Sequence, residues 1–99
     1  MIHAEISIYP IGTDSPSVSF FVAKAIDAIK DLKIKHQITP MGTILEAENI
    51  EQIFEASKNM LEVIHRLGVK RVEVILKIDS RNDKKQTMQE KIQSLEKHL

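Results

Sequence analysis

The segment Thr39-Pro40-Met41-Gly42-Thr43 carries residue types that a small-molecule site needs. Gly42 would let the backbone approach a ligand closely, because glycine has no side chain beyond its α-carbon. Thr39 and Thr43 offer hydroxyl groups, and the Met41 thioether offers a soft, adaptable contact. The same five residues also suit a tight turn between two strands, and composition alone favours that simpler interpretation.

Polar and charged side chains from both ends of the chain form a second candidate group. Glu5, Ser7 and Lys77 are predicted to project from the same face of a sheet, where they would form a polar network. Arg81 and Lys84 follow in a charged loop, and the forked guanidinium of Arg81 suits an anion such as a phosphate. Because most charged loops are merely solvated, the anion site is the less favoured interpretation.

Composition excludes several kinds of chemistry. The chain has 99 residues and no cysteine, which rules out disulfides, thiol catalysis and zinc–thiolate sites. Basic and acidic residues number 14 each, and a formal net charge of zero argues against a nucleic-acid partner. Neither a phosphate-binding glycine motif nor a G-x-S-x-G elbow is present. No apolar run approaches the roughly 20 residues of a membrane span, and no basic leader precedes an apolar stretch, so we expect a cytoplasmic protein with no membrane partner.

The four histidines do not predict a metal site. His3, His36, His65 and His98 fall on four different predicted elements, with no pair at i,i+4. A metal ion needs convergent ligands, so we expect no metal and no cofactor. Each histidine is instead expected to be exposed or to lie at an interface.

Hydropathy patterns place the candidate residues on a β-α-β-β-α-β chain followed by a third helix. Alternation of apolar and polar residues predicts strands, and apolar spacings of three and four predict helices. The predicted strands cover residues 2–9, two short stretches within 34–48, and 69–79. The predicted helices start near Ser15, after Asn49 and after Thr87, where residues suited to N-caps stand. Gly68 is predicted to end the second helix.

This order is typical of a ferredoxin-like α+β fold, with two helices on one face of an antiparallel sheet. We expect one domain over residues 1–99. Two helices can cover only one side, which leaves polar residues of the first strand, such as Glu5 and Ser7, on an open face. Because the core of so small a protein is thin, we expect the open face to meet another subunit.

The chain resembles the small thiamine-binding protein family related to YkoF. The pieces that carry the resemblance run in order from end to end, and Thr-Pro-Met-Gly-Thr is the most specific of them. They are residues 4–8 with 10–13, residues 39–43, residues 68–71, and residues 77–79 with Arg81, residues 83–85 and residues 87–88.

The resemblance implies a ferredoxin-like fold that assembles through its sheets into dimers or tetramers. It also implies non-catalytic binding of thiamine, or of its hydroxymethylpyrimidine part, at or near a subunit interface. The thiazolium cation calls for a carboxylate or an aromatic face, and the aminopyrimidine calls for an adjacent donor and acceptor beside an apolar slot. We therefore assign ligand binding to Glu5, Ser7, Thr39, Met41, Gly42, Thr43 and Lys77, and anion binding to Arg81 and Lys84.

Three alternatives stay open. An anion-responsive protein would use Arg81 and Lys84. A purely structural or regulatory oligomeric module would use the open sheet face for subunit contact alone. A small enzyme would use Glu5 or Glu73 as a general base, which is the least favoured of the three.

Overall fold

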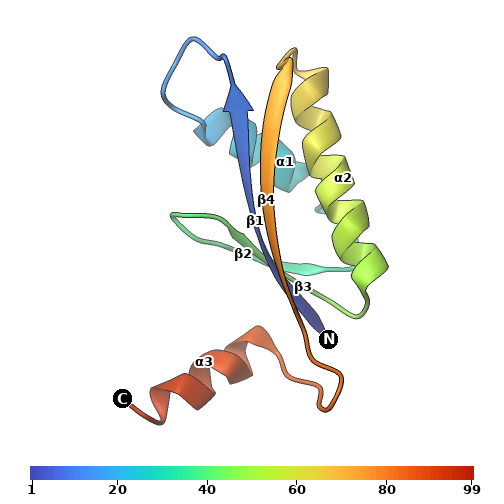
Figure 1. Cartoon of the computed structure of the whole chain (residues 1–99), viewed down its shortest axis with the longest axis vertical. Coiled ribbons are helices and arrows are strands. Elements are labelled where there is room, and N and C mark those ends of the chain that lie inside the picture. The colour runs from blue at the N-terminus through green and yellow to red at the C-terminus, as the bar shows by residue number, and fades with distance from the viewer.

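A computed structural model describes all 99 residues and has the expected α+β architecture (Figure 1). Four antiparallel strands form one sheet in the order β2-β3-β1-β4, which is the ferredoxin-like order. Helices α1 and α2 pack against each other and α2 packs on the sheet, while α3 follows the last strand. The elements are β1 (Ile2–Ile11), α1 (Ser19–Asp27), β2 (Lys35–Ile38), β3 (Thr43–Ala47), α2 (Ile50–Arg66), β4 (Arg71–Ser80) and α3 (Met88–Glu96).

The hydrophobic core lies between the sheet and the two helices α1 and α2. Alternate residues of β1, from Ala4 to Ile8, are buried on this side, as its period of two requires. A stripe at spacings of three and four on α2 meets them. The largest fully buried side chains are Ile6, Ile29, Leu45, Ile53, Met60 and Ile64.

The ends of α2 follow the sequence signals. The Asn49 side chain accepts a hydrogen bond from the Gln52 backbone N–H at 3.0 Å, and the Gln52 side chain accepts one from the Asn49 N–H at 3.2 Å. This reciprocal pair is the predicted capping box. Gly68 has a φ of +97°, a left-handed conformation that glycine adopts without a steric penalty, and the helix ends just before it.

The predicted start of the first helix near Ser15 is wrong, because α1 begins at Ser19. The Ser15 hydroxyl accepts a hydrogen bond from the Ser17 N–H, and its carbonyl accepts one from the Thr13 hydroxyl. These local bonds hold the segment in a turn, which competes with helix formation. The helix also ends earlier than its apolar stripe suggests, since the chain after Asp27 continues in single turns.

The sheet face opposite α1 and α2 is covered at one end by the start of α3. One Glu46 carboxylate oxygen accepts hydrogen bonds from His3 Nε2 at 2.9 Å and from the Met88 N–H at 2.7 Å. The other Glu46 oxygen is buried without a partner. His3 is therefore buried within its own chain, and the prediction of an exposed or interfacial His3 is wrong.

Beyond its first turn, α3 extends away from the rest of the molecule, at the end opposite the β1–α1 loop (Figure 1). The radius of gyration, 14.6 Å, exceeds the roughly 13 Å of a compact domain of this length. Apolar side chains of the helix and the terminus after it are consequently exposed, among them Ile92, Leu95 and Leu99. No helix of the chain combines the length and the hydropathy required to cross a bilayer.

Replacement of Glu46 by glutamine (Glu46→Gln) is expected to lower the free energy of unfolding at neutral pH by about 1–3 kcal/mol, as measured by urea titration. The reason is that a buried, charge-assisted hydrogen bond is lost. Burial opposes ionisation of Glu46, yet the bonds from His3 and Met88 outweigh it and hold the pKa below its ordinary value. The stabilisation is therefore present above the ordinary glutamate pKa and is lost as pH falls through the lowered pKa.

The matched control is Glu48→Gln, because Glu48 is exposed and pairs with Lys85 only at 3.5 Å on the surface. It should change the unfolding free energy by less than about 0.5 kcal/mol. The difference in unfolding free energy between the wild type and Glu46→Gln should also become smaller in acid. A difference in unfolding free energy that stays constant with pH would contradict this role of Glu46.

Candidate ligand-binding site

A pocket exists because β1 and β3 differ in length. Strand β1 pairs with β4 over all ten of its residues, but with β3 only from Ile2 to Ile6. From Ser7 to Ile11 it has a strand on one side only. A pocket of about 150 Å³ opens at this unpaired edge, and α1 and the turn between β2 and β3 complete it.

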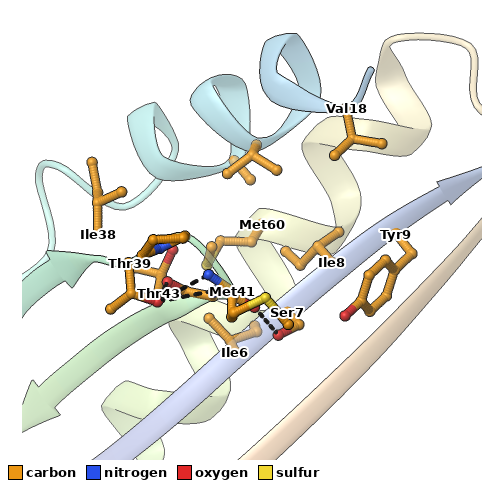
Figure 2. A pocket seen from close by; sticks show the side chains of 14 residues that line it. Ile6, Ser7, Ile8, Tyr9, Val18, Ile38, Thr39, Met41, Thr43 and Met60 are labelled. Atoms are coloured by element: carbon orange, nitrogen blue, oxygen red, sulfur yellow. Dashed lines mark hydrogen bonds between the residues drawn. The ribbon is translucent and has the colours of Figure 1, made fainter. Parts of the chain in front are cut away.

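The walls of the pocket are mostly apolar. Side chains from α1, α2 and the buried face of β1 form them, and Ile38 flanks the turn (Figure 2). The polar groups lie along β1 and the turn, where Ser7 and Tyr9 stand on one side and the threonines on the other. The 14 lining residues are Ile6, Ser7, Ile8, Tyr9, Val18, Val22, Ala25, Ile38, Thr39, Pro40, Met41, Gly42, Thr43 and Met60.

Thr39 holds the turn together. Its hydroxyl donates to the Gly42 carbonyl at 2.7 Å and accepts from the N–H groups of Gly42 and Met41 at 3.1 and 3.3 Å. Its backbone N–H also donates to the Gly42 carbonyl at 2.9 Å. The hydroxyl that the sequence suggests for a ligand is thus used by the protein itself, so Thr39 shapes the pocket.

Gly42 is required by a close approach to β1. A β-carbon at this position would lie 2.9 Å from Ser7 Oγ, which is too close, and 3.1 Å from the Ile6 carbonyl oxygen, which is tight for a backbone atom. The Ser7 hydroxyl in turn donates to the Met41 carbonyl at 3.1 Å and ties the turn to the strand (Figure 2). The backbone approach predicted for a ligand is therefore made to the protein's own strand.

Thr43 and Met41 keep their side chains available. Thr43 is buried and lines the pocket, and its hydroxyl makes no hydrogen bond within the chain. Met41 is 80% exposed, so its thioether stands at the pocket mouth without a packing partner. These two side chains, unlike those of Thr39 and Gly42, are free for a ligand.

Glu5 and Lys77 lie outside the pocket lining, on the neighbouring open face of the sheet. They stand directly opposite each other on β1 and β4, and both line a shallow depression together with Asp79 and Lys91. Glu5 Cγ is nevertheless 3.4 Å from the point that a β-carbon of residue 42 would occupy. Glu5 therefore borders the turn that closes the pocket. The structure thus brings Ser7, Thr39, Met41, Gly42 and Thr43 together in one pocket, with Glu5 beside them.

Arg81 and Lys84 border a separate, wide depression that shares no residue with the pocket. The Arg81 guanidinium donates to both carboxylate oxygens of Asp83, at 2.6 and 2.9 Å, and this holds the pKa of Asp83 below its ordinary value. Two of the Arg81 donor nitrogens, Nε and one Nη, are therefore already used within the chain. No group of three or more His, Asp or Glu side chains is arranged to hold a metal ion.

Several lining residues were not among the sequence-based candidates. Ile8, Val18, Val22, Ala25 and Met60 follow the apolar periodicity of buried strands and helices, so they are indistinguishable from core residues. Their place in a pocket depends on where β3 stops and where α1 lies. The turn residues 39–43 mark where β3 begins, but no local sequence signal reports its register on β1 or the position of α1.

Comparison with known proteins places the chain in a family. The family model described as "Thiamine-binding protein" matches residues 4–96. The UPF0045 protein of Methanothermobacter thermautotrophicus is 39% identical over 99 residues, which cover 100% of both chains.

Solved structures agree with this. The hypothetical protein MJ1052 of Methanocaldococcus jannaschii is 37% identical and superposes with a TM-score of 0.88 over 96% of this chain and 95% of that one. A Thermotoga maritima protein, named as a candidate for thiamine biosynthesis or salvage, superposes with a TM-score of 0.79 at 22% identity, over 95% of this chain and 97% of that one, and it supports the fold alone. Because the family model spans almost the whole chain and the archaeal relative aligns from end to end, this chain belongs to the thiamine-binding protein family.

Proposed function

We propose that this protein binds thiamine, or its hydroxymethylpyrimidine part, in the pocket between α1, the unpaired edge of β1 and the turn before β3. The observation that carries the proposal is the size and lining of that pocket, in a chain of this family. A cavity of roughly 150 Å³ holds a ring of the size of benzene. The pyrimidine ring therefore fits inside, and the thiazolium ring would lie at the mouth.

The lining suits an aromatic ring with polar substituents. Small-molecule sites combine apolar walls with a few convergent polar groups, and this pocket has that composition. The free Thr43 hydroxyl is the polar group placed deepest, since the residue is only 3% exposed. It can donate to a ring nitrogen or accept from the exocyclic amino group.

The thiazolium cation finds two complementary groups near the mouth. Glu5 borders the turn from the open sheet face, and its carboxylate would favour a permanent positive charge. The exposed Tyr9 ring offers a π face to the same cation. Lys77 stands opposite Glu5 on β4, and its positive charge would repel the thiazolium. The balance between the Glu5 and Lys77 charges would therefore tune the affinity for thiamine.

A second copy of the chain would complete this arrangement. The open face beside Glu5 exposes Tyr9 and Ile75, the latter at 63%, and both would be buried by a partner sheet. The thiazolium would then lie near a subunit interface. Assembly through the sheets into a dimer or tetramer is part of the proposal.

Binding without catalysis fits the lining best. Tyr9 is the only titratable residue among those that line the pocket, so no carboxylate or imidazole stands inside it to act as a general base on the pyrimidine. Glu5 and Glu73, the candidates for that role, lie on the open face. The anion-responsive alternative is weakened because Asp83 pairs with the Arg81 guanidinium through two of its nitrogens and offsets its charge.

The variant Thr43→Val tests the pocket directly. We expect calorimetry to show heat with thiamine and with hydroxymethylpyrimidine for the wild type, and affinity for both lowered about threefold to tenfold in the variant, through loss of one hydrogen bond. Stability should be retained, because no protein group uses the Thr43 hydroxyl. Ser94→Ala is the control for loss of a hydroxyl, since Ser94 is exposed and outside the lining, and it should leave affinity unchanged. Absence of heat with both ligands at millimolar concentration would reject the proposal.

Glu5→Gln separates the two halves of the ligand. It is expected to lower the affinity for thiamine several-fold, because the favourable interaction with the thiazolium charge is lost, and to leave the affinity for hydroxymethylpyrimidine unchanged. The thiamine affinity of the wild type, but not that of the variant, should fall with added salt. An equal loss for both ligands would show that Glu5 acts on the pocket shape and not on the cation.

A further inference from the structure

The hydrogen bonds of the β2–β3 turn fix the direction of backbone groups along β1. The Thr39 N–H donates to the Gly42 carbonyl, so these two residues form a hydrogen-bonded pair. Such pairs alternate along antiparallel strands, and the next pair, Ile38 with Thr43, is therefore of the other type. It follows that Thr43 directs its backbone N–H and C=O away from β2 and toward β1.

The same alternation continues into β1. Thr43 stands opposite Ile6, and Leu45 stands opposite Ala4, so the even-numbered residues of β1 direct their N–H and C=O groups toward β3. Ile8 is next in this series, but β3 begins at Thr43 and has no residue opposite Ile8. Its two backbone groups thus point to the unpaired edge, and no hydrogen bond outside the regular strands involves them.

Pro10 agrees independently with this direction. Proline has no N–H, and within sheets it occurs where no strand requires the donor. Pro10 is opposite Val72 of β4 and shares the direction of Ile8, so its missing donor faces the unpaired edge and not β4. If the direction were reversed, a central ladder bond of β1 to β4 would be lost at this residue.

Ile8 consequently presents one donor and one acceptor side by side at the pocket. The residue is only 6% exposed, and it lines the cavity. A buried backbone donor without a partner is costly, and nearly all such groups in native proteins are satisfied by protein, water or ligand. The unpaired edge therefore has a backbone N–H and a C=O without hydrogen-bond partners, next to the apolar walls of the pocket.

We propose that the main-chain N–H and C=O of Ile8 recognise the aminopyrimidine edge of the ligand. This inference rests on the proposed function, and it names the groups that give the site its selectivity. The Ile8 N–H would donate to a ring nitrogen, and the Ile8 carbonyl would accept from the exocyclic amino group beside it. The ring pairs with the strand edge as a neighbouring strand would.

A small ring fits this edge better than an added peptide strand. Only Ile8 and Pro10 direct backbone groups outward beyond Ile6, and Pro10 can only accept. A peptide strand would thus find a single donor, which gives little of the main-chain pairing on which strand addition depends. An aminopyrimidine needs one donor and one acceptor, and Ile8 alone supplies both.

Amide hydrogen exchange with 4-amino-5-hydroxymethyl-2-methylpyrimidine as probe tests the proposal. In the free protein, the Ile8 amide should exchange at least about tenfold faster than the Ile6 amide, which is bonded to Thr43. Saturation with the probe should slow exchange at Ile8 by about tenfold or more and leave Ile6 unchanged. The same pyrimidine without its 4-amino group should bind about tenfold more weakly than the probe.

The variant pair Ile8→Pro and Ile8→Ala isolates the donor. Both truncate the buried side chain, but only Ile8→Pro removes the N–H, at a position where its direction tolerates proline. We expect Ile8→Pro to bind the probe about tenfold more weakly than Ile8→Ala. Should Ile8→Pro fail to fold, the exchange rates of the wild type decide the question.

The outcomes separate this inference from the proposed function. Calorimetric binding of the probe without added protection at Ile8 would overturn the inference and leave the function standing. Protection of Ile8 in the free protein that rises with protein concentration would also overturn it, because a second copy would then occupy the edge. Absence of any binding would reject the proposed function, and the inference with it.

Discussion

The close contact between Gly42 and β1 is the constraint on which the site depends. Because residue 42 has no β-carbon, the turn can lie against Ser7 Oγ and the Ile6 carbonyl, and the Ser7 hydroxyl fastens it there. Strand β3 begins directly after this turn, at Thr43 opposite Ile6, and so it does not extend along the rest of β1, which continues for five more residues beside β4. The unpaired edge and the cavity beside it lie just beyond this contact, while the direction of the Ile8 backbone follows from the register of the three strands.

Local patterns in the sequence were sufficient for most of the fold. Alternation located β1 and β4 to within two residues, and the Asn49–Gln52 pair located the start of α2, because each signal is satisfied by residues close in the chain. The prediction of where α1 begins was wrong because a local signal at Ser15 has a second local use. Ser15 has the side chain of a good N-cap, but its hydroxyl is bonded to the Ser17 N–H within a turn, and propensity alone cannot distinguish these two uses.

The sequence predicted which turn lines the pocket, but not the structural roles of the residues in that turn. The segment from Thr39 to Thr43 does line the pocket, yet Thr39 and Gly42 serve the turn, and only Thr43 and Met41 keep free side chains. Ile8 gave no signal at all, since an isoleucine in an alternating strand is indistinguishable from a core residue. Its importance arises from backbone direction, which depends on the pairing of three strands and therefore on contacts far apart in the sequence.

A site that uses main-chain groups places unusual demands on sequence. Any residue of suitable volume could stand at position 8, because every residue except proline supplies the same donor and acceptor. The residue type is restricted instead at the positions that set the geometry of the pocket. These are Gly42, which allows the close approach to β1, and Thr39, whose hydrogen bonds hold the turn. The anchor of α3 on Glu46 covers the His3 end of the open face, and Lys91 of this helix borders the same depression as Glu5. Tyr9 and Ile75, further along the face, stay exposed. Recognition and assembly can thus occupy neighbouring parts of one small sheet, with different residues responsible for each.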